Sequence, residues 1–313
     1  MHAEAVLIPE QEEPALVWIA VLAIHEGQQV EVGQLVARLE GRLGSVELLA
    51  QRGGYVTGLQ ARPGQAASPG DVLCYLAEKA TLPSALPGPD VVMHLADSPL
   101  DPTAILIYGG GGHGKAVLEL LRALRAYRPV GVIDDGLPVG SDVLGLPVVG
   151  GADHLKEWHR RGVRLAANGV GGIGNVAARL KVFDTLARAG FSCPALVHPT
   201  ALVEPSAVLE AGVQVMPHAY VGSSARIGFG SVINIGAVVP HDCTLGRVVN
   251  ISPGAALAGF VHVGEHTQIG MNATVNLNLT IGEGCLIGNG ATVKADVPAG
   301  TRVWAGSTWP LRS

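Results

Sequence analysis

The sequence contains few aromatic residues, few charges and no long apolar run. Aromatic residues make up 4% of the 313 residues and charged residues 15%. The net charge is −5 and basic residues do not cluster, which argues against a nucleic-acid-binding protein. The longest apolar stretch, residues 15–24, is too short to cross a bilayer, so we expect no membrane insertion.

The cationic start that is typical of signal peptides is also missing. The N-terminus instead carries four glutamates: Glu4, Glu10, Glu12 and Glu13. The cysteines lie far apart without a CxxC pair, which favours buried thiols in a reducing compartment over disulfides or a zinc site. They are Cys74, Cys193, Cys243 and Cys285. Together these features predict a cytoplasmic protein.

Glycine, in contrast, is abundant: 43 of 313 residues, about twice the usual share. An aliphatic residue recurs at every sixth position from Val203 to Val293, sixteen times without a break, and a small or apolar residue follows four positions after each. A period of six fits neither a helix nor one long strand, so each hexad must be a short strand plus a bend of a β-solenoid. Glycines directly after the aliphatic position, such as Gly222 and Gly246, are expected to supply bends that need positive φ.

The first eighty residues consist of two similar halves, offset by 37 positions and marked by Gly27-Gln28 and Gly64-Gln65. This pattern resembles a biotinyl/lipoyl-like domain, a flattened β-barrel of two sheets that carries its prosthetic group on a lysine at a hairpin tip. Leu43 occupies the corresponding position, and no lysine precedes Lys79. Only an amine can form the amide link, so we expect neither lipoate nor biotin and favour a structural or docking role.

The middle of the chain reads as a β-loop-α-β unit. Residues 104–108 form a buried-strand run, the glycine-rich loop 109–115 follows, and an amphipathic stretch continues to about residue 127. A second strand, 130–133, ends in Asp134-Asp135. Such a loop can present backbone N–H groups to a phosphate at the N-terminus of a helix.

Three interpretations of this loop are open. A P-loop would need a Ser or Thr hydroxyl for Mg²⁺ after Lys115, but the next residue is Ala116, which has none. A dinucleotide fingerprint fits Gly109, Gly111 and Gly114 with Asp134 further on, but the space before the solenoid is too short for a second mononucleotide-binding half. The third interpretation is a sugar-binding domain, and it comes from a resemblance.

Three features of the chain are similar to one enzyme family. They are the glycine-rich loop with its His-Gly-Lys, the later Ala167–Gly171 stretch with Asn175 and Arg179, and His198-Pro199 leading into the hexads. This family comprises the hexapeptide-repeat sugar O/N-acetyltransferases of the sialic-acid and pilin-glycan (UDP-4-amino-sugar N-acetyltransferase) type. The resemblance runs from about 104 to 306. It implies a left-handed parallel β-helix with three hexads per coil, acetyl-CoA as cosubstrate, a sugar or UDP-sugar substrate and a homotrimer.

The predicted architecture is therefore multidomain α/β and β. We expect a lipoyl-like β-barrel over 1–80, a Pro-rich linker over 81–102, a small Rossmann-like sugar-binding domain over 103–194 and the β-helix over 195–313. Sixteen hexads at three per coil make about five coils, more than the roughly three repeats that a solenoid needs for stability.

His241-Asp242 interrupts the repeats directly after Val239-Pro240, so it is predicted to lie at a corner. Acetyl transfer needs a base for the acceptor's proton and donors for the oxyanion. His241 can be that base and Asp242 can fix its tautomer, and the family pattern places both roles here. Gly259 lies one coil of eighteen residues further, and the resemblance assigns its backbone N–H to the acetyl oxygen.

The resemblance also assigns binding residues. Substrate contacts are expected at Gly111, Gly112, His113, Asp134, Asp135 and Asn234. The coenzyme A track is expected along the backbones of Gly259, Met271 and Asn289. Two departures affect this assignment: Asn250 stands where relatives often carry a second histidine, and the tail from Gly306 to Pro310 differs from their Gly-Asn-Pro-Ala ending.

Three alternatives remain. Within the class, the enzyme could O-acetylate a sugar of sialic-acid type. A zinc-dependent lyase similar to the γ-class carbonic anhydrases would need three histidines from His218, His241, His262 and His266, but His262 and His266 fall on different faces. The third alternative is a non-catalytic trimeric scaffold. The sequence leaves open which sugar is modified and on which atom.

Overall fold

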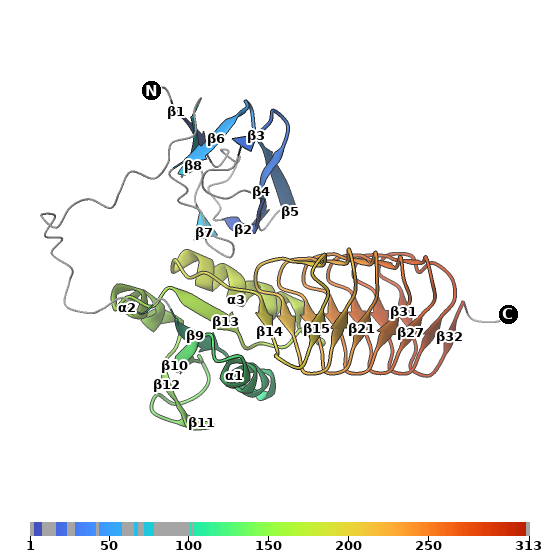
Figure 1. Ribbon diagram of the computed structural model, residues 1–313. Helices are drawn as coiled ribbons and strands as arrows, with labels where there is room; N and C mark the ends of the chain where they lie inside the picture. Colours follow the sequence, from blue (N-terminus) through green and yellow to red (C-terminus); the bar gives the residue numbers. More distant parts are fainter. Residues whose placement is uncertain are drawn as a thin grey trace, which may run out of the picture. The chain divides into compact units, whose positions relative to one another are not determined.

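The computed structural model describes residues 3–7, 17–23, 29–41, 44–57, 66–67, 72–77, 101 and 103–310 (Figure 1). The chain divides into two compact units. One comprises Met1–Pro102, Leu155–Arg164 and Asp184–Ser192, and the other comprises Thr103–His154, Leu165–Phe183 and Cys193–Ser313. The predicted linker lies outside the described residues apart from Asp101, and the segment boundaries at 80, 102 and 194 stay predictions.

The N-terminal strands form two four-stranded antiparallel sheets. The first sheet has the order β1 (Ala3–Leu7), β8 (Val72–Ala77), β6 (Gly54–Thr57), β3 (Gln29–Val30). The second has the order β5 (Gly44–Leu49), β4 (Leu35–Gly41), β2 (Val17–Leu22), β7 (Ala66–Ala67). Leu43, which the sequence places where a carrier lysine would be, lies outside the described residues, and the lipoyl-like assignment stays a prediction.

A five-stranded sheet forms the centre of the α/β domain. Its order is β11 (Asp142–Val143), β12 (Leu146–Gly150), β10 (Arg128–Ile133), β9 (Ala104–Tyr108), β13 (Leu165–Asn168). All neighbours are parallel except β11, which pairs antiparallel with β12. The helical segments are α1 (Gly112–Leu124), the 3-10 turn η1 (Ala152–His154), α2 (Leu155–Arg160) and α3 (Val176–Arg188).

Helix α1 joins the sheet to the β-helix. It begins after Gly111, whose backbone is extended and which provides no side-chain cap, and it ends where Arg125 adopts a left-handed φ of 56° and donates its N–H to Leu121. Apolar residues spaced along one side of α1 pack into a shared core. From α1, β9 and the first coils of the β-helix, this core contains Val117, Leu118, Leu121, Ile105, Ile107, Leu196, Met216 and Val232.

The C-terminal part is a three-sided parallel β-helix built from two-residue strands (Figure 1). Sheet 1 contains β14 (Leu196–Val197), β17 (Gln214–Val215), β20 (Val232–Ile233), β23 (Asn250–Ile251), β26 (Gln268–Ile269), β29 (Leu286–Ile287) and β31 (Arg302–Val303). Sheet 2 contains β15 (Leu202–Val203), β18 (Tyr220–Val221), β21 (Val238–Val239), β24 (Ala256–Leu257), β27 (Thr274–Val275), β30 (Thr292–Val293) and β32 (Thr308–Trp309). Sheet 3 contains β16 (Val208–Leu209), β19 (Arg226–Ile227), β22 (Thr244–Leu245), β25 (His262–Val263) and β28 (Thr280–Ile281).

The hexad prediction is confirmed. Each of the sixteen predicted aliphatic residues is the second residue of a strand and points into one continuous core, as Val221, Val239 and Leu257 do. Strands pair at a register of eighteen residues, for example Val221 with Val239. The solenoid is longer than the hexads indicated, because β14 precedes them and β31 and β32 follow them.

The explanation for the glycines after the aliphatic positions is wrong. None of them is among the glycines with positive φ; that conformation occurs two positions later in the corner, for instance at Gly230 and Asp242. A Cβ at Gly222 would lie 2.6 Å from the backbone nitrogen of His241, one coil further, and a Cβ at Gly246 would lie 2.7 Å from that of Glu265. These glycines are therefore required by the close stacking of successive coils.

All four cysteines are described and buried, and none is in a disulfide. Within the described ranges, no helix combines the length and the apolar character that a membrane crossing requires.

Candidate active site

His241 and Asp242 lie at the corner between β21 of sheet 2 and β22 of sheet 3. The Nδ1 atom of His241 is 2.9 Å from Oδ2 of Asp242. Asp242 has a left-handed φ of 57°, and its N–H donates to the carbonyl of Ser223, one coil earlier. Because a carboxylate accepts a hydrogen bond from Nδ1–H, the neutral imidazole keeps its lone pair on Nε2. Both side chains are about half exposed, so this pair can meet a ligand.

Gly259 follows on the same corner, one coil beyond His241. A Cβ at this position would lie 2.5 Å from Cε1 and 2.7 Å from Nε2 of His241, so only glycine leaves room for the imidazole. The Gly259 carbonyl accepts the N–H of Asn278, whereas no acceptor for the Gly259 N–H occurs among the described residues. The structure thus brings His241, Asp242 and Gly259 together, as the sequence predicts.

Phe260 was not among the predicted site residues, yet it contacts the imidazole. The two ring centroids are 5.2 Å apart and the rings meet edge to face at 84°. One signal in the sequence could have indicated it. The equivalent corner position in neighbouring coils holds Ser224, Asp242 and Asn278, and a large aromatic residue is out of place in that series.

The predicted residues Asn234, Met271 and Asn289 lie on another edge, the corner between sheets 1 and 2. Asn234 accepts the N–H of Ile235 through its own Oδ1 at 2.8 Å, and Asn289 Oδ1 accepts the N–H of Met271 at 2.9 Å. Met271 and Asn289 are therefore adjacent coil neighbours, as predicted. The structure does not bring these three residues to His241 within one chain.

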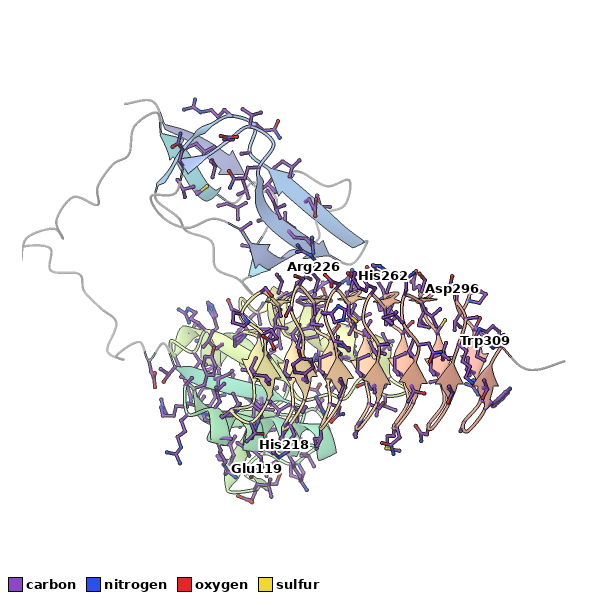
Figure 2. The ribbon with its side chains drawn as sticks, turned by 45° about the vertical axis from the view of Figure 1, so that its right-hand side comes forward. Glu119, His218, Arg226, His262, Asp296 and Trp309 are labelled. Carbon is purple, nitrogen blue, oxygen red and sulfur yellow. The ribbon has the colours of Figure 1, made fainter. Side chains whose placement is uncertain are left out.

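Figure 2 shows sheet 3 and the corner between sheets 1 and 2 on opposite sides of the β-helix. Arg226 and His262, on β19 and β25 of sheet 3, lie on one side of the β-helix, and His218, at the corner between sheets 1 and 2, lies on the opposite side. Glu119 of α1 lies on the same side as His218.

The glycine-rich loop forms an open N-terminus of α1. Gly111 and Gly112 are exposed, and a Cβ added to either would meet no atom within 4 Å. The first hydrogen bond inside this helix runs from the N–H of Lys115 to the carbonyl of Gly111. Gly114, in contrast, packs against the carbonyl of Gly109 and has no room for a side chain. Gly111 and Gly112 are exposed, and their N–H groups have no acceptor among the residues that the structure describes, which is the arrangement that binds phosphate at helix N-termini.

Asp134 and Asp135 fix the loops around this helix end. Asp134 Oδ2 accepts the Gly110 N–H at 2.7 Å, and its Oδ1 accepts the N–H groups of Gly136 and Leu137. Asp135 accepts the Tyr108 hydroxyl at 2.6 Å and the Ala152 N–H at 2.8 Å. The Tyr108 bond lowers the pKa of Asp135, while burial, followed by that bond, raises the pKa of Tyr108. Both predicted substrate contacts therefore have a structural task.

Arg179 of α3 is completely buried and holds several segments together. Its guanidinium donates to the carbonyls of Val170 and Gly230, at 2.6 Å and 2.9 Å, and to Oε1 of Gln214 at 3.3 Å. Gln214 in turn donates to the carbonyl of Asn168 at 2.8 Å. Burial lowers the pKa of Arg179 to about 10, which still leaves it charged at neutral pH. This network fixes α3 and the end of β13 on the first coils of the β-helix.

The same network assigns the tautomer of His113. Its Nε2 is 2.8 Å from Oε1 of Gln214, and the Arg179 and Asn168 bonds fix which end of that amide is oxygen. Oε1 can only accept, so Nε2 of His113 must carry the hydrogen. Burial, followed by the charge of Arg179, lowers the pKa of His113 to about 4. His113 is therefore neutral near pH 7, and its Nδ1 is a hydrogen-bond acceptor.

Asn250, where the sequence departs from its relatives, lies on the same face of sheet 1 and is buried. Its amide donates to Oγ of Ser252 at 2.9 Å, and a Cβ at Gly172 would contact it. The neighbouring Gln268 accepts the N–H of Gly174 at 2.9 Å. The loop after β13 therefore rests on this face of the β-helix.

Across the described part of the chain, no group of three or more His, Cys, Asp or Glu side chains is arranged to hold a metal ion.

Two stretches of the chain match known families. Residues 104–186 match the PglD N-terminal domain, and residues 260–295 match the bacterial transferase hexapeptide (six repeats). No curated protein sequence matches the chain significantly.

Solved structures give longer matches. A variant of perosamine N-acetyltransferase from Caulobacter crescentus, in complex with CoA and GDP-perosamine, is 34% identical with a TM-score of 0.62, and the match covers 67% of this chain and 97% of that chain. The acetyltransferase domain of PglB from Neisseria gonorrhoeae, in complex with acetyl coenzyme A, is 35% identical with a TM-score of 0.61, covering 66% and 98%. WeeI from Acinetobacter baumannii is 29% identical with a TM-score of 0.58, covering 67% and 98%.

The two family matches fall in the α/β domain and in the β-helix, and the solved relatives are covered over almost their whole length. They confirm the resemblance seen in the sequence and, with it, the left hand of the β-helix. The chain therefore belongs to the hexapeptide-repeat family of nucleotide-sugar N-acetyltransferases.

Proposed function

We propose that this enzyme transfers the acetyl group of acetyl-CoA to an amino group of a nucleotide-linked sugar. The observation that carries the proposal is the corner at which the His241–Asp242 pair meets the N–H of Gly259, which no described residue accepts. A proton acceptor and an oxyanion donor are the two groups that acyl transfer to an amine requires. The similar enzyme from Caulobacter crescentus is in complex with CoA and GDP-perosamine, and the similar domain from Neisseria gonorrhoeae is in complex with acetyl coenzyme A.

In this mechanism, Nε2 of His241 removes a proton from the amine as its nitrogen bonds to the thioester carbonyl carbon. The Gly259 N–H stabilises the negative oxygen of the tetrahedral intermediate. Asp242 accepts a hydrogen bond from the Nδ1–H group throughout and stabilises the imidazolium. When the carbon–sulfur bond breaks, His241 returns the proton to the sulfur, so the products are the amide and the free thiol.

The open N-terminus of α1 is proposed to hold the diphosphate of the sugar nucleotide through Gly111 and Gly112. The Nδ1 atom of His113 then accepts a hydrogen bond from a ligand hydroxyl or N–H, since its Nε2 is engaged by Gln214. A carboxylate can accept about four hydrogen bonds, so Asp134 and Asp135 keep capacity for a ligand beside their loop contacts.

Each active site is proposed to use two subunits of a homotrimer. In one chain, the α/β domain packs on sheet 1 through His113 and Gln214, whereas His241 occupies the corner opposite sheet 1. A sugar nucleotide at α1 and a base at that corner are thus on different sides of the same prism. A neighbouring β-helix would bring its own His241 to the sugar, so that this histidine faces the edge of the first chain that carries Asn234, Met271 and Asn289.

Thiol release from acetyl-CoA, measured with a panel of UDP- and GDP-linked amino sugars, tests the proposal. We expect release only with amino sugars, acetylation on nitrogen in the product, and loss of release in His241→Ala. Acetylation of a hydroxyl would instead support the O-acetyltransferase alternative. Absence of release with every acceptor, together with no binding of CoA, would support the scaffold alternative.

A further inference from the structure

Phe260 occupies a backbone conformation that disfavours its side chain. Its φ is 57°, in the left-handed region, where a bulky residue is a genuine outlier. The same corner position in the neighbouring coils has φ values of 58° at Ser224, 57° at Asp242 and 59° at Asn278. Aspartate and asparagine tolerate this region, and serine is small, whereas phenylalanine has no polar group to hydrogen-bond locally. The aromatic residue is therefore strained where its counterparts are not.

Burial does not explain the strain. Val248 is also left-handed, with φ of 50°, but its side chain is buried at 1% exposure and gains packing in return. The side chain of Phe260 is 46% exposed. Residues held in sparsely populated backbone conformations cluster at functional sites, and the ring that Phe260 contacts is the imidazole of His241.

The imidazole needs such a contact. A histidine χ2 torsion has broad, roughly two-fold preferences, so a half-exposed ring is not held by its own rotamer. Asp242 holds Nδ1, and the backbone of Gly259 lies beside Cε1 and Nε2. The Phe260 ring, edge to face with the imidazole, restrains it from a further direction, and the Phe260 N–H donates to the His241 carbonyl at 3.2 Å.

We propose that Phe260 is a positioning residue for the proposed acetyl transfer, which holds the His241 imidazole beside Gly259 with Nε2 facing the acceptor. The inference rests on the proposed function. Phe260 acts through His241, and its backbone strain is retained because the ring restrains the base.

The test compares Phe260→Asn with Phe260→Tyr in the full-length protein. Asparagine tolerates left-handed φ but removes the ring, so we expect kcat to fall about tenfold while the KM values for both substrates stay within about twofold. The midpoint of thermal unfolding should rise at the same time, because the strain is relieved. Tyrosine keeps the ring and the strain, so it should restore kcat and show no rise in the midpoint.

Ser224→Gly is the matched control, since it changes the equivalent corner position two coils before Phe260, and its kcat should equal that of the wild type. The inference is overturned if Phe260→Asn keeps the wild-type kcat, or if kcat and the unfolding midpoint fall together, which would show that the ring is only packing. A failure of the proposed function looks different: the unmodified enzyme would then acetylate no amino sugar, or His241→Ala would turn over as fast as the wild type.

Discussion

The molecule contains two polar clusters, each with a histidine, that differ in how completely their hydrogen bonds are satisfied. Between the α/β domain and sheet 1, Arg179, Gln214, His113 and Asn168 are buried or nearly so and satisfy one another. At the corner between sheets 2 and 3, His241 and Asp242 are about half exposed and leave Nε2 without an internal partner among the described residues. Satisfied polar networks fix a structure, and incompletely satisfied ones are available to a ligand.

The two histidines make this difference concrete. His113 donates from Nε2 into the network, and burial keeps it neutral with a pKa of about 4. His241 is held at Nδ1 by a carboxylate and presents Nε2 at an open corner. Loss of the buried Arg179 from the first cluster should therefore act mainly on folding, and changes in the second cluster should act mainly on turnover.

The largest effect is expected from His241→Ala. Without the base, kcat should fall by about 10² to 10⁴-fold, the usual contribution of a general base. Thermal unfolding should be almost unchanged, since the side chain is half exposed and forms no part of the core. Steady-state kinetics measure kcat, and calorimetry measures the midpoint of thermal unfolding. Turnover at the wild-type rate would remove His241 from the mechanism.

Arg179→Met should show the reverse pattern. The carbonyls of Val170 and Gly230 would lose their buried donor, and the free energy of unfolding should fall by about 3 kcal/mol or more. Arg188→Met on the same helix is the matched control. Arg188 pairs only at the surface with Asp184, so about 0.5 kcal/mol or less is expected. Equal losses in urea unfolding of the two variants would contradict a structural role for the network.

His113 should make stability depend on pH. Its pKa is about 4 in the folded protein and near 6.5 when unfolded, so the unfolded chain binds more protons between these values. The contribution of neutral His113 is complete above about pH 6.5 and is lost as the pH falls towards 4, with a total of about 3 kcal/mol. His113→Gln cannot titrate, and its unfolding free energy should vary less over this window. A variant with the same pH dependence as the wild type would assign the effect to other groups.

The sequence predicts the β-helix well because one physical requirement, an aliphatic residue at each inward position, is repeated every six residues. It also predicts the meeting of His241 and Gly259, since a register of eighteen residues is enough to stack them. Arg179 could be recognised as part of a family pattern, but its role could not. Its partners come from β17, from a corner of the β-helix and from the loop after β13, and no local period encodes that convergence.

Two further features show what local patterns miss. A glycine in a repeat can serve a bend or a close approach, and Gly222 serves the second because the backbone of His241 lies against it. The strain at Phe260 depends on φ, which the sequence indicates only through the contrast with Ser224, Asp242 and Asn278 at equivalent positions. In both cases the physical reason lies in the adjacent coil.

The smallest effect on folding is expected from a substitution at Gly111, at the open end of α1, which should change helix stability and substrate binding in opposite directions. Gly111 is at the N-cap position with an extended backbone and free space around it. In Gly111→Asp, a carboxylate can cap the free N–H groups, and stability should rise by a few tenths of a kcal/mol. The same carboxylate occupies the proposed phosphate position and repels the phosphate, so KM for the nucleotide sugar should rise about tenfold or more while KM for acetyl-CoA is unchanged.

The control Gly111→Ala adds a Cβ without charge, and it should raise KM for the nucleotide sugar less than Gly111→Asp does. If Gly111→Asp binds the nucleotide sugar as well as the wild type does, the diphosphate is held elsewhere, and the proposed role of this helix end is wrong.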